Sequence, residues 1–177
     1  MQERTFSLRS VAQVRAVAAL VWAVGLVTAL GRDPDAAASV PTVAALLLVA
    51  YPLIDALSSA FEARRTGSRL SIVNGLISLS ATIGLAVATA TADAGATLAV
   101  FGVWAVVSGA LLLVAALVRR RAGSRELPMI VSGGLSTLAG LSFVAGSTQD
   151  VAHLTMLAGY ATVGAVLYLV WSARAGR

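Results

Sequence analysis

The 177-residue sequence has no cysteine, one histidine and few charges. Without cysteine there is no disulfide framework, thiolate nucleophile or thiolate metal site, and one histidine excludes a multi-histidine metal site. Charged residues make up 12% of the chain and hydrophobic residues 58%, whereas a soluble domain carries roughly 25% charged residues. The composition therefore excludes an ordinary water-soluble globule and favours a membrane protein.

Long uncharged stretches divide the chain into six segments. Successive gaps between charged residues span 16, 19, 23, 25, 23 and 23 residues, and a helix needs about 20 apolar residues to cross a bilayer. The first gap reaches this length if residues 11–15 extend it, and the second if Asp55 lies within the membrane. We therefore expect an all-α membrane protein with six transmembrane helices, near residues 12–31, 40–63, 69–91, 96–118, 127–146 and 151–173.

The arginines predict how these helices are oriented. If the N-terminus is cytoplasmic, twelve of the thirteen arginines fall on the cytoplasmic side, and only Arg32 falls on the other side, among four aspartates. By the positive-inside rule, both termini are then expected in the cytoplasm. The net charge of +5 is explained by anchoring at an anionic leaflet, so the expected partner is the lipid bilayer and not nucleic acid.

A short motif repeats at the cytoplasmic ends. Residues 64–69 read RRTGSR, residues 120–125 read RRAGSR, and the chain ends in RAGR. These turns predict one transmembrane domain of three helical hairpins in the same orientation, at about 12–63, 69–118 and 127–173; the alternative is convergent use of small and basic residues in tight turns. Gly67 suits the left-handed residue that ends a helix, and Ser68 suits the N-cap of the next helix.

Asp55 is the one ionisable residue well inside a predicted span, and such residues usually face the bundle interior. Polar side chains recur around it at helical spacing on the second helix, and a matching stripe lies on the third. Because the hairpin turn brings these faces together, we expect a hydrogen bond between Asp55 and Asn74. The candidate intramembrane polar cluster consists of Tyr51, Asp55, Ser59, Asn74 and Ser78.

Two interpretations of this cluster are open. It is either an interhelical clasp, with Asp55 bonded to Asn74 or reached by Arg65 or Arg69, or a proton or substrate site in a cavity. Pro52 is expected to kink the second helix nearby. The sequence has no motif of a nucleophilic or phosphate-binding enzyme, and we expect no catalysis, cofactor or metal.

Three stretches resemble the short repeated domain of HdeD-like membrane proteins. They are residues 101–109 (FGVWAVVSG), residues 129–140 (MIVSGGLSTLAG) and the last helix from GYATVG at 159–164 to Arg174. The resemblance implies a glycine-punctuated hairpin repeated in a six-span protein of the bacterial inner membrane. The namesake of the family is linked to acid resistance, and most members have no assigned activity. Asp55 departs from the pattern, because it stands about where a repeat glycine is expected.

Three functions follow as expectations. The first is a non-catalytic membrane protein, structural or stress-associated, that scaffolds or binds partners. The second is a small transporter or channel that uses Asp55 and Asn74. The third is an accessory subunit of a larger membrane complex. Small residues also recur at four-residue spacing, as at Ala105/Gly109 and Ser132/Ser136/Gly140. Such faces allow helices to pack closely, within one bundle or in a homo-oligomer.

Overall fold

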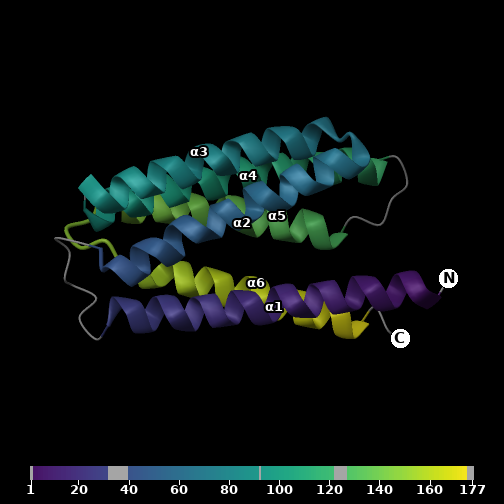
Figure 1. The fold of residues 1–177 in the computed structure, drawn as a ribbon, viewed down its shortest axis with the longest axis horizontal. Coiled ribbons are helices and arrows are strands. Elements are labelled where there is room, and N and C mark those ends of the chain that lie inside the picture. Colours follow the sequence, from purple (N-terminus) through teal and green to yellow (C-terminus); the bar gives the residue numbers. More distant parts are fainter. Residues whose placement is uncertain (1, 32–39, 92, 122–126, 175–177) are drawn as a thin grey trace.

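The computed structural model describes residues 2–31, 40–91, 93–121 and 127–174, and these form an all-α bundle (Figure 1). Its helices are α1 (Gln2–Leu30), α2 (Thr42–Thr66), α3 (Arg69–Thr91), α4 (Ala94–Arg121), α5 (Leu127–Gly146) and α6 (Thr155–Arg174). Within the described part of the chain, α2, α3, α4 and residues Met129–Gly146 of α5 are long and apolar enough to cross a membrane. The described apolar stretches of α1 and α6 are shorter, Ala16–Leu30 and Thr155–Leu167. By helix length and hydropathy, the chain is a multi-pass membrane protein.

Two helix starts differ from the prediction by more than three residues: that of α1 by ten and that of α6 by four. Helix α1 begins at Gln2, not near residue 12, because hydropathy marks only the apolar part of a helix, while Gln, Glu and Arg also favour helix. Helix α6 begins at Thr155, not at 151. The hydroxyls of Ser147 and Thr148 bond back to carbonyls of the last turn of α5, and a turn then reverses the chain before α6 starts.

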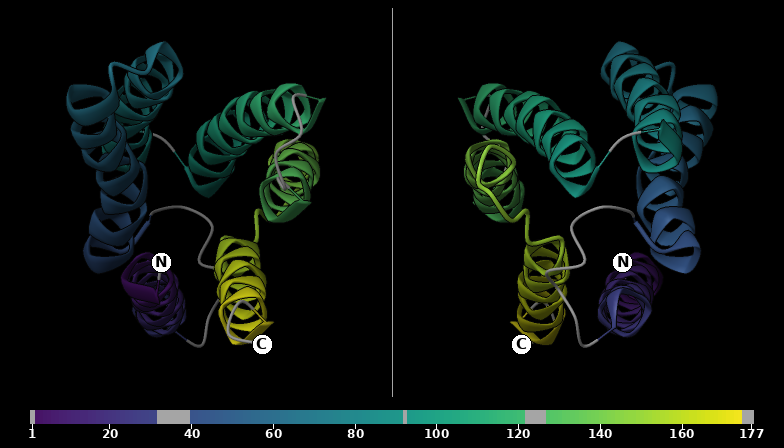
Figure 2. Two further views of the ribbon diagram at one scale, coloured as in Figure 1. Left: turned by 90° about the vertical axis from the view of Figure 1, so that its right-hand side faces the viewer. Right: turned by 90° about the vertical axis from the view of Figure 1, so that its left-hand side faces the viewer.

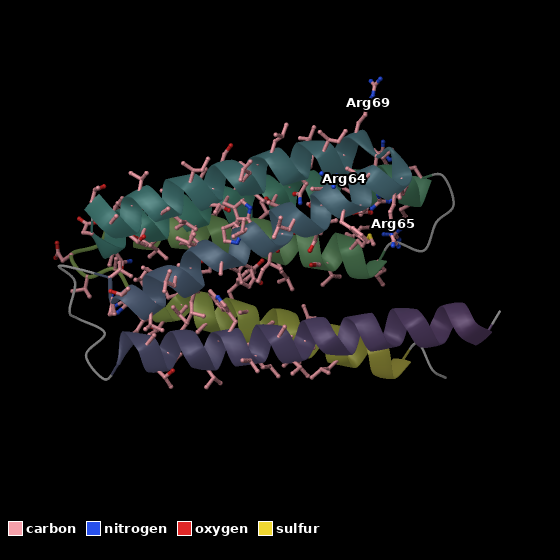
Figure 3. All side chains as sticks on the ribbon, viewed as in Figure 1. Arg64, Arg65 and Arg69 are labelled. Atoms are coloured by element: carbon pink, nitrogen blue, oxygen red, sulfur yellow. The ribbon has the colours of Figure 1, made fainter. Side chains whose placement is uncertain are left out.

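Successive helices run in opposite directions, so the two chain ends lie at the same end of the bundle (Figure 1). The labelled side chains of Arg64, Arg65 and Arg69 lie at this end (Figure 3), and Arg119, Arg120 and Arg121 form the last turn of α4. We call this the arginine end, and the opposite end, where Asp93 precedes α4, the acidic end. The arginines of α2, α3 and α4 thus lie together at one end, as the sequence predicts.

The turn between α2 and α3 has the geometry expected from its motif. Gly67 has φ 67° and ψ 15°, and its N–H donates to the Ala63 carbonyl at 2.8 Å. The Ser68 hydroxyl accepts the N–H of Ser71 at 3.3 Å, which caps α3. The equivalent residues Gly123 and Ser124 lie outside the described residues.

The closest helix pairs are α2 with α3, α4 with α5, and α1 with α6 (Figure 2). The predicted hairpins would pair α1 with α2, α3 with α4 and α5 with α6, and these neighbours pack less extensively. The tight pairs are those whose ends meet at the arginine end. The predicted duplication itself stays a prediction, but the packing units are shifted by one helix from the predicted hairpins.

Glycines allow α4 and α5 to approach closely. A Cβ atom added to Gly102 would lie 2.9 Å from the Gly140 carbonyl oxygen, and one added to Gly109 would lie 2.9 Å from that of Gly133. Each helix carries its two glycines seven residues apart, so the antiparallel helices match glycine to glycine at two levels. Such contacts stabilise helix association in lipid, where apolar burial contributes little.

Candidate functional site

Asp55 lies near the middle of α2, and its carboxylate faces α3. Asp55 Oδ2 accepts hydrogen bonds from Asn74 Nδ2 at 2.8 Å and from the Ser78 hydroxyl at 2.6 Å. Asn74 Nδ2 also donates to the Ser59 hydroxyl at 3.0 Å. The expected bond between Asp55 and Asn74 is therefore present, and four of the five predicted side chains join one network.

Trp104 extends this network to a third helix. Its indole Nε1 donates to the Ser78 hydroxyl at 3.0 Å, so Ser78 accepts from α4 and donates to α2. Trp104 was not among the residues that the sequence predicts for the polar cluster. A usable signal existed, because a buried tryptophan usually needs an acceptor for its N–H, but the sequence does not show which acceptor α3 supplies. We call Asp55, Ser59, Asn74, Ser78 and Trp104 the polar network.

The turn spacing of both helices places these groups together. Asp55 and Ser59 are four residues apart on α2, and Asn74 and Ser78 are four apart on α3, so each pair lies on one helix face. Gly75 lies at the contact between the two faces, where an added Cβ atom would be in van der Waals contact with the Ser59 Cβ at 3.4 Å. Ser59 and Ser78 are buried, and Asp55 and Asn74 are half-buried.

Tyr51 joins the site through its ring. The ring centroid lies 4.7 Å from that of Trp22, 5.8 Å from Trp104 and 5.9 Å from Phe101. Further edge contacts continue this set of rings through the bundle. We call the set the aromatic core; its members are Trp22, Tyr51, Phe101, Trp104, Phe143 and Tyr160.

Two hydrogen bonds hold the edges of the aromatic core. Trp22 Nε1 donates to the Leu47 carbonyl at 2.8 Å, which links α1 to α2. The hydroxyls of Ser136 and Tyr160 lie 2.7 Å apart and link α5 to α6. Helix α2 runs without interruption through Pro52, which is buried.

Arg65 and Arg69, the two arginines expected as alternative partners of Asp55, both lie elsewhere. The Arg65 guanidinium lies 4.2 Å from the centroid of the Phe61 ring, at the exposed end of α2, and the Arg69 side chain extends away from the bundle (Figure 3). A guanidinium gains a cation–π contact in this position and keeps its hydration at the helix end. The partners of the Asp55 carboxylate are instead the neutral donors Asn74 and Ser78.

A hollow on the described surface lies away from the polar network. It is an open, mostly apolar groove of about 720 Å³ between α1 and α2, and no residue of the polar network lines it. Trp22, Gly25, Pro41 and Leu47 are among its lining residues. Among the residues that the structure describes, no group of three or more His, Cys, Asp or Glu side chains is placed to hold a metal ion.

Comparison with known proteins adds no family: no family model, no curated protein and no solved structure matches the chain.

Proposed function

We propose that this chain is a non-catalytic integral membrane protein of the HdeD-like type, whose helical bundle has a structural or partner-binding role. The proposal rests on the hydrogen bonds that the intramembrane carboxylate of Asp55 accepts. Asp55 Oδ2 accepts from two residues of α3, and one of these also accepts from Trp104 of α4. A polar group within a bilayer that is bonded in this way ties three helices together.

The inventory of side chains supports a role without catalysis. Acid–base or nucleophilic chemistry needs a second functional group within hydrogen-bond reach of the first. Glu62, the nearest acid along α2, lies seven residues from Asp55, or about 10 Å at the rise of an α-helix, and is exposed. The donors around Asp55 are an amide and a hydroxyl, which suit a clasp better than an active site.

The charge distribution supports a bacterial inner-membrane location with the arginine end in the cytoplasm. The labelled arginines of the α2–α3 turn lie at the same end as both chain termini (Figure 3). An anionic cytoplasmic leaflet attracts such side chains. Homo-oligomers and accessory-subunit complexes are both compatible with this proposal, and copurification from native membranes without crosslinker distinguishes them.

The test compares Asp55→Asn with Asp150→Asn, a control at an exposed acid outside the bundle core. Each variant is purified and reconstituted, and both the free energy of unfolding and the proton flux into liposomes are measured. The proposal expects no proton flux in the unaltered protein, and a loss of stability on changing Asp55 only. Proton flux that disappears in Asp55→Asn while stability is unchanged would instead establish the transport function.

A further inference from the structure

The Arg65 side chain turns back along α2 and lies over the ring of Phe61. Its guanidinium carbon is 4.2 Å from the centroid of that ring. The contact holds the charge at the surface of α2, but an aromatic ring takes up few of the five N–H donors of a guanidinium. Within the part of the chain that the structure describes, no oxygen accepts a hydrogen bond from Arg65 and no acid pairs with it. An acceptor for these donors therefore has to come from outside the chain.

An exposed apolar stripe of α2 leads up to this guanidinium. Ile54, Leu57 and Phe61 are 62%, 63% and 58% exposed. Together with Arg65 they follow one another at intervals of three, four and four residues, so they share one face of the helix. The three apolar residues cover about 10 Å of the helix axis, in a helix that is apolar enough to cross a membrane. This face therefore offers an acyl chain an apolar surface that ends at a cation.

The charges around Arg65 favour an occupant with net negative charge. Residues 62–69 contain three arginines and one glutamate, and all four side chains are exposed. Neither Arg64 nor Arg69 has an ion-pair partner among the residues that the structure describes. The helix dipole accounts for Arg64 and Arg65 in the last turn of α2, but Arg69 opens α3, where the dipole disfavours a cation. An external anion offsets this repulsion.

Of these three arginines, Arg65 is the one that adjoins the apolar stripe. Arg64 is one residue earlier and so lies about 100° around the helix. Arg69 extends away from the bundle, whereas the Arg65 side chain lies on the other side of the α2–α3 turn (Figure 3). Arg64 and Arg69 instead add to the positive potential of this end, which repels the cation of a zwitterionic headgroup and attracts an anionic headgroup.

We propose that this face of α2 binds one anionic phospholipid, with its phosphate at the Arg65 guanidinium and an acyl chain along Ile54, Leu57 and Phe61. The planar guanidinium donates to two phosphate oxygens at once, and Phe61 is a positioning residue that holds it above the apolar stripe. The inference rests on the proposed location of the arginine end at an anionic leaflet. It adds a defined lipid site at one residue to an otherwise diffuse attraction.

Binding of phosphatidylglycerol to the purified protein in neutral detergent tests the site, with the affinity read from the bound fraction in native mass spectrometry. Arg65→Gln removes the donors and should weaken the affinity at least about fivefold. The matched control is Arg120→Gln, which removes the same charge from an exposed arginine at the same end of the bundle. It should change the affinity less than about twofold, because salt screens distant charges. Equal losses would overturn the proposal, since the attraction would then be diffuse.

Two further variants test the parts of the site separately. Phe61→Leu keeps the apolar stripe but removes the ring, so it should weaken binding although the net charge is unchanged. Glu62→Gln removes the acid three residues before Arg65 and should tighten binding, because a carboxylate repels the phosphate. Unchanged affinity in both variants would contradict the site as described.

Photocrosslinking gives the position of the lipid. Phosphatidylglycerol with a diazirine on one acyl chain should label peptides that contain residues 54–61, and Arg65→Gln should remove most of this label. Equal labelling by phosphatidylcholine with the same chain, or displacement of the lipid by inorganic phosphate, would overturn the proposal, because the site would then ignore headgroup charge or take a free anion. The stability comparison of Asp55→Asn with Asp150→Asn involves no headgroup, so the proposed function stands or falls independently of this result.

Discussion

The Ser78 hydroxyl donates to Asp55 Oδ2 at 2.6 Å while it accepts the indole N–H of Trp104 at 3.0 Å. One small side chain of α3 therefore joins α2 and α4. Because a hydroxyl is both a donor and an acceptor, serine fills this place and a purely apolar residue of similar size cannot.

Replacing Ser78 by alanine tests this junction. Ser78→Ala leaves the Trp104 N–H without its acceptor and removes one donor from Asp55, so we expect the free energy of unfolding to fall by about 1–3 kcal/mol. The measurement is unfolding in mixed micelles with increasing sodium dodecyl sulfate. The matched control is Ser80→Ala, at an exposed serine of the same helix. Equal effects at the two positions would contradict the junction.

The glycine contacts between α4 and α5 predict that a larger side chain at these positions destabilises the bundle. A Cβ atom added to Gly109 would lie 2.7 Å from the Thr137 backbone nitrogen, so Gly109→Ala forces the helices apart. We expect a loss of about 1–3 kcal/mol, as for other overpacked cores. Gly134→Ala on α5 is the control, because its added Cβ atom meets nothing within 4 Å. It should be neutral or stabilising, and a comparable loss there would show that space does not decide the effect.

The left-handed conformation of Gly67 predicts a backbone effect that is independent of packing. An added Cβ atom meets no neighbour within 4 Å, yet φ is 67°. Gly67→Ala should therefore cost about 1–2 kcal/mol from the backbone alone. Gly67→Asn should cost less, since asparagine tolerates this region better than alanine. Thermal unfolding in detergent ranks the three proteins; the account fails here if alanine and asparagine are equivalent.

The distribution of arginines predicts a membrane topology that reporter fusions can measure. A reporter active only in the cytoplasm should be active when fused after Arg174 and inactive when fused after Thr148, in the turn between α5 and α6. The physical reason is the attraction of the arginine end to the cytoplasmic leaflet. The opposite pattern of activity would reverse the proposed orientation while leaving the fold unchanged.

The sequence predicted the helices well where an apolar stretch and a helix coincide. The uncharged gaps place α3 and α5 at their observed bounds. They miss the first ten residues of α1 because hydropathy reports the part suited to lipid, not the hydrogen-bonded helix. They also start α6 four residues early, because the turn after Gly146 depends on local bonds of Ser147 and Thr148.

Part of the polar network could be predicted, because it depends on helical spacing. Asp55, Ser59, Asn74 and Ser78 each lie four residues from a partner, and a tight turn joins their helices. Trp104 could not be assigned, because its contact with Ser78 depends on how α4 crosses α3. The packing of α1 against α6 could not be predicted from the sequence either, because contacts between residues so far apart in the chain leave no local pattern.

The central claim is that Asp55 and Asn74 stabilise the bundle through their mutual contact. A double-mutant cycle measures this directly, with Asp55→Ala, Asn74→Ala and the double variant unfolded in the same micelles. We predict a coupling of about 1 kcal/mol, within the range of hydrogen bonds between membrane helices. Additivity within about 0.3 kcal/mol, the behaviour of independent sites, would contradict the claim.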